Sequence, residues 1–412
     1  MNGCGNGMSN QNLPKLQLPE SLNYIGVFLT MSCQLKCSYC INIPDSNQEL
    51  TDRSELFPIL NAKHHIGLTP EQWVTALSRI PAREDLPLTI QGGEPTVYYN
   101  GKGLNQIIEG IPHYLDILTN IGNMKVFKNI SDKSRHKLQR KAPYPSIRVS
   151  WHKDEMERTW KDGFKELVRR CEELKDYGFD VSPTKSESDV GIYMVSHPTN
   201  VSPDENLWKG KVPFETKEFL GVHDGELYGH YAYKHSTDLI SRNIYYKTLE
   251  CECRTSELLI DPAGFIWGCH HDLYHAWANE NMQSQFEFLQ ACHFAYKDYN
   301  NLFVWIKGIK PIGHILDDKF AMDDLKEFRK CYSYGECVGC DCKIKNDRTQ
   351  SKDDRGVVHT SVEIKNIKWP DDFRKERSIK FAEALSAAMK SMADKEKLRK
   401  DLKDYLENKK YK

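Results

Sequence analysis

Short apolar runs alternate with stretches of helical periodicity along the first 245 residues of the chain. Strands are predicted at the apolar runs, which occupy residues 24–30, 87–91, 114–119, 146–151 and 190–196. Helices are predicted for residues 69–79, 103–111 and 154–177, and for the region after Thr216. This alternation favours parallel βαβ units in an α/β sheet or barrel. Active sites in such folds lie at the carboxyl ends of the strands.

The pattern changes near residue 250. Two short apolar runs, 257–260 and 265–268, flank the turn sequence Asp261-Pro262-Ala263-Gly264, which predicts a β-hairpin. We expect residues 246–350 to form a second, smaller, cysteine-rich α+β domain. Residues 1–22 read as a flexible lead-in. Residues 351–412 read as a C-terminal extension with an amphipathic helix, which places at helical spacing the apolar residues Phe381, Leu385, Met389 and Met392.

Length and charge narrow the classes of protein that fit. The chain has 412 residues, of which 39% are hydrophobic and 28% charged, enough for two or three globular domains. A formal net charge of -1 gives no general attraction to nucleic acid or to a membrane surface. The N-terminus does not have the basic and apolar regions of a signal peptide, and the chain contains no apolar run near the length of a membrane span. We therefore expect a cytoplasmic protein without a membrane partner, and a nucleic-acid partner is not favoured.

Thirteen cysteines are many for a reducing compartment, where clustered cysteines more often bind metal or catalyse than form disulfides. Cys33, Cys37 and Cys40 follow the first predicted strand with the spacing C-x3-C-x2-C. Three thiolates can hold three irons of a 4Fe-4S cluster and leave the fourth iron open for a ligand. The alternative is zinc, which in a structural site needs four ligands. The next candidates for a fourth ligand are His64 and His65.

A second motif, Gln91-Gly92-Gly93-Glu94-Pro95, ends the second predicted strand. Glycines allow a close approach of backbone carbonyls, and a carboxylate such as Glu94 suits an ammonium group. Taken alone, the motif is equally typical of a turn.

The two motifs together resemble those of the radical S-adenosylmethionine (radical SAM) enzymes, over about residues 24–245. The resemblance implies a partial (β/α)6 barrel over residues 23–245. It also implies that Cys33, Cys37 and Cys40 are the catalytic ligands of a 4Fe-4S cluster, whose fourth iron is chelated by the amino and carboxylate groups of SAM. The residues expected to contact SAM are Tyr39, Gly92, Gly93, Glu94, Thr119 and Ser150.

The resemblance further implies a mechanism. A reduced cluster passes one electron to SAM, and the resulting 5′-deoxyadenosyl radical abstracts a hydrogen atom from the substrate. Such an enzyme needs a one-electron donor such as flavodoxin or ferredoxin. The protein itself positions and shields the reactive group.

The later cysteines resemble those of the SPASM or twitch domains of radical SAM enzymes, in which a hairpin with Gly-x4-Cys supplies cluster ligands. Here Gly264 and Cys269 have that spacing, although the downstream spacings x5, x2 and x1 depart from the usual SPASM order. One auxiliary 4Fe-4S cluster is expected, bound by Cys253, Cys269 and two of the later group, while two clusters or a zinc site remain open. The expected metal ligands are Cys253, Cys269, Cys331, Cys337, Cys340 and Cys342.

These features predict a radical SAM oxidoreductase or maturase acting on a peptide, a protein or a small natural product. Because the first strand is expected near residue 24, a separate leader-binding module is not expected before it. One alternative is a dehydrogenase or epimerase of a sugar-like small molecule. The others are a nucleic-acid-modifying radical enzyme and a non-catalytic zinc or iron–sulfur binding or regulatory protein.

Overall fold

The computed structural model of the chain describes residues 13–19, 22–37, 39–40, 67–140, 142–217, 255–277 and 310–322, and several short strands outside these ranges. Three of the expected metal ligands, Cys337, Cys340 and Cys342, lie outside the described residues. The amphipathic helix expected in the C-terminal extension lies outside them too.

A nine-stranded sheet with the order β13-β12-β11-β1-β2-β3-β4-β5-β6 forms the centre of the fold. Strands β1 to β6 pair in chain order and in parallel, and β11 pairs in parallel with the other side of β1. The pairs β11–β12 and β12–β13 are antiparallel, so β12 alone runs against the direction of the other strands of this sheet. The mixed α/β class with a mostly parallel sheet is therefore confirmed. The strands are β1 (Tyr24–Thr30), β2 (Leu88–Gly92), β3 (Leu115–Thr119), β4 (Ile147–Trp151), β5 (Val190–Val195), β6 (Phe214–Lys217), β11 (Glu257–Ile260), β12 (Phe265–Trp267) and β13 (Gly313–His314).

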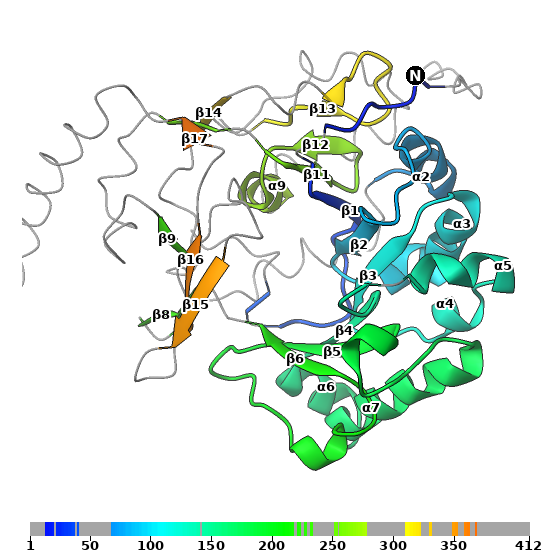
Figure 1. Cartoon of the computed structure of the whole chain (residues 1–412), viewed down its shortest axis with the longest axis vertical. Coiled ribbons are helices and arrows are strands. Elements are labelled where there is room, and N and C mark those ends of the chain that lie inside the picture. The colour runs from blue at the N-terminus through cyan, green and yellow to red at the C-terminus, as the bar shows by residue number, and fades with distance from the viewer. Residues whose placement is uncertain are drawn as a thin grey trace, which may run out of the picture.

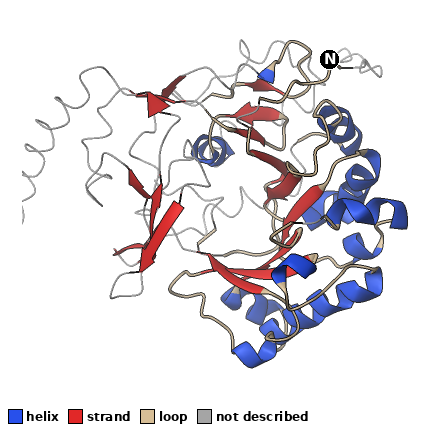
Figure 2. Cartoon of the chain, in the orientation of Figure 1, coloured by secondary structure: helices blue, strands red, loops and turns tan. Residues whose placement is uncertain are grey.

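Helices α2 to α7 cover one side of this sheet, which curves through the molecule (Figure 1, Figure 2). They are α2 (Pro70–Leu77), α3 (Lys102–Gly110), α4 (Lys125–Lys128), α5 (Asp132–Arg135), α6 (Lys153–Thr159) and α7 (Gly163–Glu173). Short 3-10 helices are η3 (Pro95–Gly101), η4 (His136–Leu138), η5 (Leu174–Tyr177), η6 (Lys185–Glu187) and η7 (Glu205–Leu207). Helix α9 (His270–Trp277) lies on the other side of the sheet, where the Tyr274 ring packs edge-on against Phe28 of β1 at 5.8 Å.

Local sequence explains the best-defined elements. Strand β1 is buried along almost its whole length, as a strand covered on both faces requires. Helix α2 begins at a capping box, in which the Thr69 hydroxyl accepts from the Gln72 backbone and the Gln72 side chain accepts from the Thr69 backbone. Pro70 occupies the first position of the helix, where its missing N–H costs nothing.

Two helix predictions are wrong in part. The helix expected over residues 154–177 is broken into α6, α7 and η5, because Asp162 adopts a left-handed backbone with φ of 57°. The described residues that directly follow Thr216, up to Tyr233, are not helical. They complete β6 and form the short strands β7 (Gly221–His223), β8 (Glu226–Tyr228) and β9 (Tyr231–Tyr233).

The flexible lead-in expected for residues 1–22 is wrong for residues 13–19, which pack against the domain. Leu16 is 4% exposed, and its N–H donates to the Arg79 carbonyl at 2.8 Å. The buried guanidinium of Arg79 donates to the carbonyls of Pro14 at 3.0 Å and Asp317 at 2.7 Å. Arg79 thus joins the lead-in, α2 and the segment after β13 through backbone groups.

The predicted hairpin forms, with Gly264 in the left-handed region at φ of 92°. It extends the central sheet, since Glu257 of β11 pairs with Tyr24 of β1. This part of residues 246–350 is therefore continuous with the main sheet and is not separate from it. The short strands outside the central sheet are β10 (Cys251–Cys253), β14 (Arg329–Cys331), β15 (Arg348–Lys352), β16 (Val358–Val362) and β17 (Ile367–Lys368). Within the described part of the chain, no helix is long and apolar enough to cross a membrane.

Candidate active site

The three clustered cysteines lie in the loop that directly follows β1. Cys37 is buried, whereas Cys33 and Cys40 are half-buried, and the Cys40 N–H donates to the Cys37 carbonyl at 3.1 Å. Burial raises the pKa of Cys33 and of Cys37 well above the ordinary thiol value, and the Cys40 thiol raises both further. The structure thus brings the three thiols close enough to repel one another as thiolates.

The loop is fixed to the end of β2 by backbone hydrogen bonds. The Gly93 N–H donates to the Thr30 carbonyl at 2.8 Å, and the Glu94 N–H donates to the Ser32 carbonyl at 2.9 Å. A Cβ atom at Gly93 would lie 2.2 Å from the Ser32 oxygen, and one at Gly92 would lie 2.3 Å from the Thr30 oxygen. Both glycines are therefore required where the cysteine loop meets β2. This is a role in packing, whereas the resemblance implied that both glycines contact SAM.

The Glu94 carboxylate is turned into the protein. It is 1% exposed and forms the N-cap of η3, accepting at Oε1 from the Thr96 N–H at 2.9 Å. The same oxygen accepts from the Thr119 hydroxyl at 2.7 Å, and Oε2 accepts from the Asn120 N–H at 2.6 Å. Burial raises the pKa of Glu94, while these hydrogen bonds act in the opposite direction. Glu94 and Thr119, both expected to contact a cofactor, are thus joined to each other.

Asn120 connects this network to the first cysteine. Its Nδ2 lies 3.7 Å from Cys33 Sγ, and its Oδ1 accepts from Gln34 Nε2 at 2.6 Å. The Leu35 N–H also donates to Cys33 Sγ, at 3.4 Å. The sulfur of Cys33 therefore receives one backbone and one side-chain N–H.

Tyr39 lies between two histidines that follow β4 and β5. Its hydroxyl is 3.1 Å from Nδ1 of His152, and its ring stacks on His197 with a centroid distance of 4.5 Å and an angle of 21°. Burial lowers the pKa of His152 to about 4, so this imidazole is neutral at physiological pH. Tyr39 was expected to contact SAM; its position within the cysteine loop does not test that expectation.

Glu155, in the first turn of α6, supports the loop from another side. Its Oε2 accepts from the Lys36 N–H at 2.8 Å and from Arg158 at 2.8 Å. These contacts lower the pKa of Glu155 against the effect of its burial. The carboxylate is therefore ionised close to the cysteines.

Ser150 is the last but one residue of β4. It is half-buried near the end of β4 and opposite Tyr193 of β5. Its hydroxyl makes no hydrogen bond to any other residue in the described ranges. The structure thus leaves the expected contact of Ser150 with a cofactor untested.

The second group of cysteines is described in part. Cys269 precedes α9 and accepts at Sγ from the Asp272 N–H at 3.4 Å. Strand β10 pairs antiparallel with β14, so that Cys251 lies opposite Cys331, with Cys253 two residues along. Residues two apart in a strand share one face of the sheet. The backbone therefore groups Cys251 with two of the expected ligands, although the sequence analysis did not include it.

His270 directly follows Cys269 and begins α9. Its Nδ1 lies 3.5 Å from Glu257 Oε2, and its ring packs against Phe28 at 5.9 Å. An ionisable pair thus lies on the face of the sheet that carries α9.

Among the residues that the structure describes, no three His, Cys, Asp or Glu side chains are grouped so that they could hold a single metal ion.

Five residues of this site were missing from the sequence-based set. Gln34 lies inside the cysteine loop, Asn120, His152 and His197 lie just after a strand, and Glu155 lies in the first turn of α6. The sequence carried one signal that could have identified such residues: polar residues directly follow consecutive parallel strands.

No protein-family model matches the sequence, and no curated protein matches it. Crystal structures of Streptococcus suis SuiB resemble this structure, with low TM-scores. The structure of SuiB bound to the precursor peptide SuiA shares 14% identity over 66% of this chain and 66% of that chain, with a TM-score of 0.27. The structure bound to S-adenosylmethionine shares 11% identity over 66% of this chain and 65% of that chain, with a TM-score of 0.27. The chain thus spans slightly less than two thirds of the SuiB chain in these structures. A TM-score of 0.27 supports no conclusion about the function of this chain.

Proposed function

We propose that the protein is a radical SAM enzyme in which Cys33, Cys37 and Cys40 hold a 4Fe-4S cluster with one open iron. The observation that carries the proposal is the grouping of these three thiols in one loop at the carboxyl edge of a parallel sheet. Enzymes with parallel sheets carry their chemistry at this edge.

The donor set fits such a cluster. Burial and mutual repulsion raise the pKa of Cys33 and Cys37, so three thiolates need a positively charged partner. Iron provides that charge, and the N–H groups of Leu35 and Asn120 that face Cys33 Sγ are typical partners of a cluster-bound sulfur.

When bound, the cluster supplies the electron that splits the sulfonium C–S bond of SAM and so generates a radical able to take hydrogen from an unactivated C–H bond. The residues of this chain hold the loop and close the site around it. Gly93 and Glu94 join the loop to β2, Glu155 joins it to α6, and Tyr39 packs against His152 and His197. Excluding water from the site protects a reactive species.

The six strands β1 to β6, parallel and in chain order with helices on one side, support the finer proposal of a partial (β/α)6 barrel. For the C-terminal part we propose one auxiliary 4Fe-4S cluster of the SPASM or twitch kind. Its proposed ligands are Cys253, Cys269 and two of the later cysteines. The Gly264-x4-Cys269 hairpin supports this assignment.

The proposed reaction is an oxidative or maturase-type modification of a peptide, a protein or a small natural product. A sugar-like substrate is the second candidate within the same chemistry. The ligands named for SuiB, SAM and a precursor peptide, are of the kinds proposed here, but a TM-score of 0.27 is too low to support the proposal.

The test is SAM cleavage by the anaerobically reconstituted protein. With a reductant, the wild-type protein should release 5′-deoxyadenosine, and the Cys40→Ala variant should release none. Cys171→Ala is a matched control, because Cys171 is fully buried in α7 and away from the loop. Undiminished cleavage by Cys40→Ala would refute the assignment of the ligands.

A further inference from the structure

The turn that follows β3 has a strained backbone. Ile121 is fully buried and adopts a φ of 54°, in the left-handed region. For a β-branched residue this conformation is a true outlier, and such backbone strain persists only where the surroundings enforce it. Such strain is concentrated at functional sites. The contacts on both sides of this turn hold Ile121 in the strained conformation.

Glu94 holds the start of the turn. Its two carboxylate oxygens accept from the Thr119 hydroxyl at 2.7 Å and from the Asn120 N–H at 2.6 Å. The Thr119 hydroxyl oxygen in turn accepts from the Ile121 N–H at 2.8 Å. The backbone of Asn120 is thus fixed on both sides.

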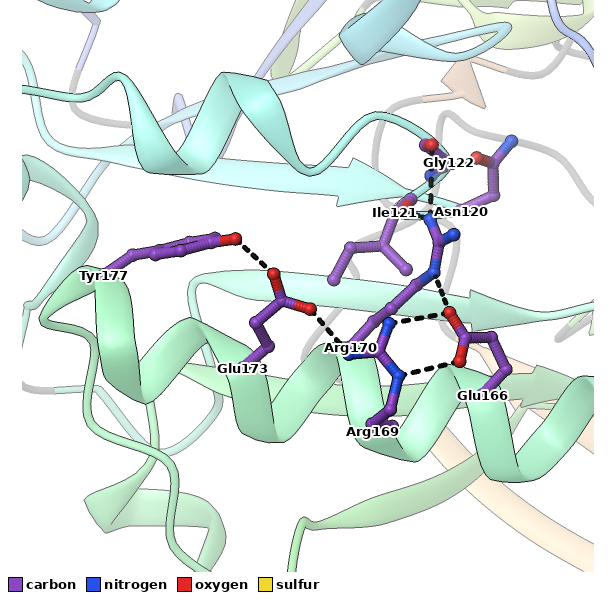
Figure 3. A network of polar contacts seen from close by, with 8 residues as sticks. All are labelled: Asn120, Ile121, Gly122, Glu166, Arg169, Arg170, Glu173 and Tyr177. Carbon is purple, nitrogen blue, oxygen red and sulfur yellow. Dashed lines mark hydrogen bonds and ion pairs between the residues drawn. The ribbon is translucent and has the colours of Figure 1, made fainter.

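Arg170 of α7 holds the end of the turn, as Figure 3 shows. Its Nη1 donates to the carbonyls of Ile121 at 3.2 Å and Gly122 at 3.3 Å. Its Nε donates to Glu166 at 2.8 Å, and its guanidinium lies 4.3 Å from the centre of the Trp160 ring. The guanidinium is therefore itself fixed in place, and it presents a rigid support to the turn.

The side-chain amide of Asn120 can have only one orientation. Its Oδ1 accepts from the Gly122 N–H at 3.0 Å, and a backbone N–H can only donate. Oδ1 also accepts from Gln34 Nε2 at 2.6 Å. The opposite end of the amide, Nδ2, is therefore the end that faces Cys33 Sγ at 3.7 Å, and it presents a donor to the sulfur.

Gly122 makes this arrangement possible. A Cβ atom at this position would lie 2.1 Å from Gln34 Nε2 and 2.9 Å from Asn120 Oδ1. A residue with a side chain would displace Gln34 from Asn120. The close approach of the cysteine loop to the turn thus depends on a glycine.

We propose that Asn120 is a positioning residue that donates a hydrogen bond to the Cys33 sulfur and thereby raises the reduction potential of the cluster. The inference rests on the proposed function, since it requires the cluster to be bound. A hydrogen bond to a ligand sulfur stabilises the more negative, reduced state of a cluster. Glu94 and Arg170 act through Asn120 by holding the strained turn.

The test is a redox titration of the reconstituted cluster in the absence of SAM. The EPR signal of the reduced cluster monitors the titration and gives the midpoint potential. Asn120→Asp keeps the acceptor for Gly122 and Gln34 but replaces the donor that faces Cys33 by a carboxylate oxygen. Asn123→Asp is the matched control, because it adds the same charge two residues beyond Ile121 while the Asn123 amide points to the Thr96 carbonyl, at 3.1 Å. We expect a clearly more negative potential for Asn120→Asp than for Asn123→Asp, with equal iron content.

Equal potentials in the two variants would overturn the inference. If Asn120→Asp binds no cluster, Asn120→Ala decides the matter, because it removes the donor that faces Cys33 without adding a charge. A more negative potential in Asn120→Ala supports the inference, and an unchanged potential overturns it. A wild-type protein that forms no cluster would show that the proposed function has failed, a result distinct from a cluster with an insensitive potential.

Discussion

The hydroxyl of Tyr39, between the second and third cysteines, lies 3.1 Å from Nδ1 of His152, which follows β4. The Tyr39 ring also stacks on His197, which follows β5. Two neighbouring strands thus contribute to the position of the cysteine loop. Together with Asn120, which follows β3, side chains from three strand ends contact the loop.

Substitution of Tyr39 should separate the contributions of its ring and its hydroxyl. The stack contributes about 0.5–1.5 kcal/mol and the hydrogen bond about 1 kcal/mol. Tyr39→Phe should therefore lose iron to a chelator only slightly faster than the wild-type protein, while Tyr39→Leu should lose it several-fold faster. Tyr177→Phe, which removes a hydroxyl contact with Glu173 in α7, is the control. Equal rates of iron loss in Tyr39→Leu and the wild-type protein would contradict this role.

Gly93→Ala should destabilise the junction between the cysteine loop and β2. The new Cβ would lie 2.2 Å and 2.4 Å from the carbonyl oxygens of Ser32 and Met31, and backbone atoms cannot yield cheaply. We expect a loss of about 3 kcal/mol in the free energy of unfolding, measured with denaturant. Gly268→Ala is the control, because its Cβ would be 3.6 Å from Ile312 and should cost less than about 1 kcal/mol. Equal stability of the two variants would show that this junction is not as tight as described.

His314 should make the fold sensitive to acid. Its Nδ1 accepts from the Leu316 N–H at 3.1 Å, and its Nε2 bonds the Ala263 carbonyl at 2.9 Å, so the neutral ring is fully satisfied. Burial lowers the pKa of His314 from 6.5 to about 3. The unfolded chain therefore takes up the proton first as pH falls, and stability is lost from about pH 6.5 downward.

The expected loss from His314 between pH 7 and pH 5 is about 2 kcal/mol in the free energy of unfolding. His314→Gln retains one donor and one acceptor but does not titrate, so its stability should fall less over this range. A slope in His314→Gln as steep as in the wild-type protein would rule out this contribution.

Cys251 is expected to affect the auxiliary site. It pairs with Cys331 across β10 and β14, and Cys253 shares its face of the strand. If Cys251 is a ligand in place of one of the later cysteines, Cys251→Ser should lower the iron content beyond the N-terminal cluster, from about eight to nearer four irons per chain. The buried Cys171→Ser variant is the control. Full iron content in Cys251→Ser would exclude Cys251 from this site.

Strands β1 to β5, β11 and β12 of the central sheet could be predicted from the sequence because apolar residues dominate them or alternate within them. The run at 24–30 corresponds residue for residue to β1. Strand β6 was not predictable in this way, because Phe214–Lys217 is short and partly exposed and is defined by its pairing with β5. The break before α7 depends on the left-handed Asp162, a conformation that helical periodicity does not reveal.

The cysteines and the glycine motif of the candidate site could also be predicted, because their spacing is local. The residues that contact the cysteine loop could not be predicted. Tyr39 and His152 are 113 residues apart, and Gln34 and Asn120 are 86 apart, so only the packed sheet brings them together. The inward direction of Glu94 was equally hidden, since it depends on Thr119 and Asn120 at the end of the next strand.

The central claim is that one iron of the N-terminal cluster has no protein ligand and binds SAM. The most direct measurement is the EPR spectrum of the reduced, reconstituted protein with SAM carrying nitrogen-15 in its amino group. The account predicts a change in the spectrum on addition of SAM and a hyperfine coupling from that nitrogen. A spectrum that SAM leaves unchanged, or a triplet site filled by zinc, would contradict it.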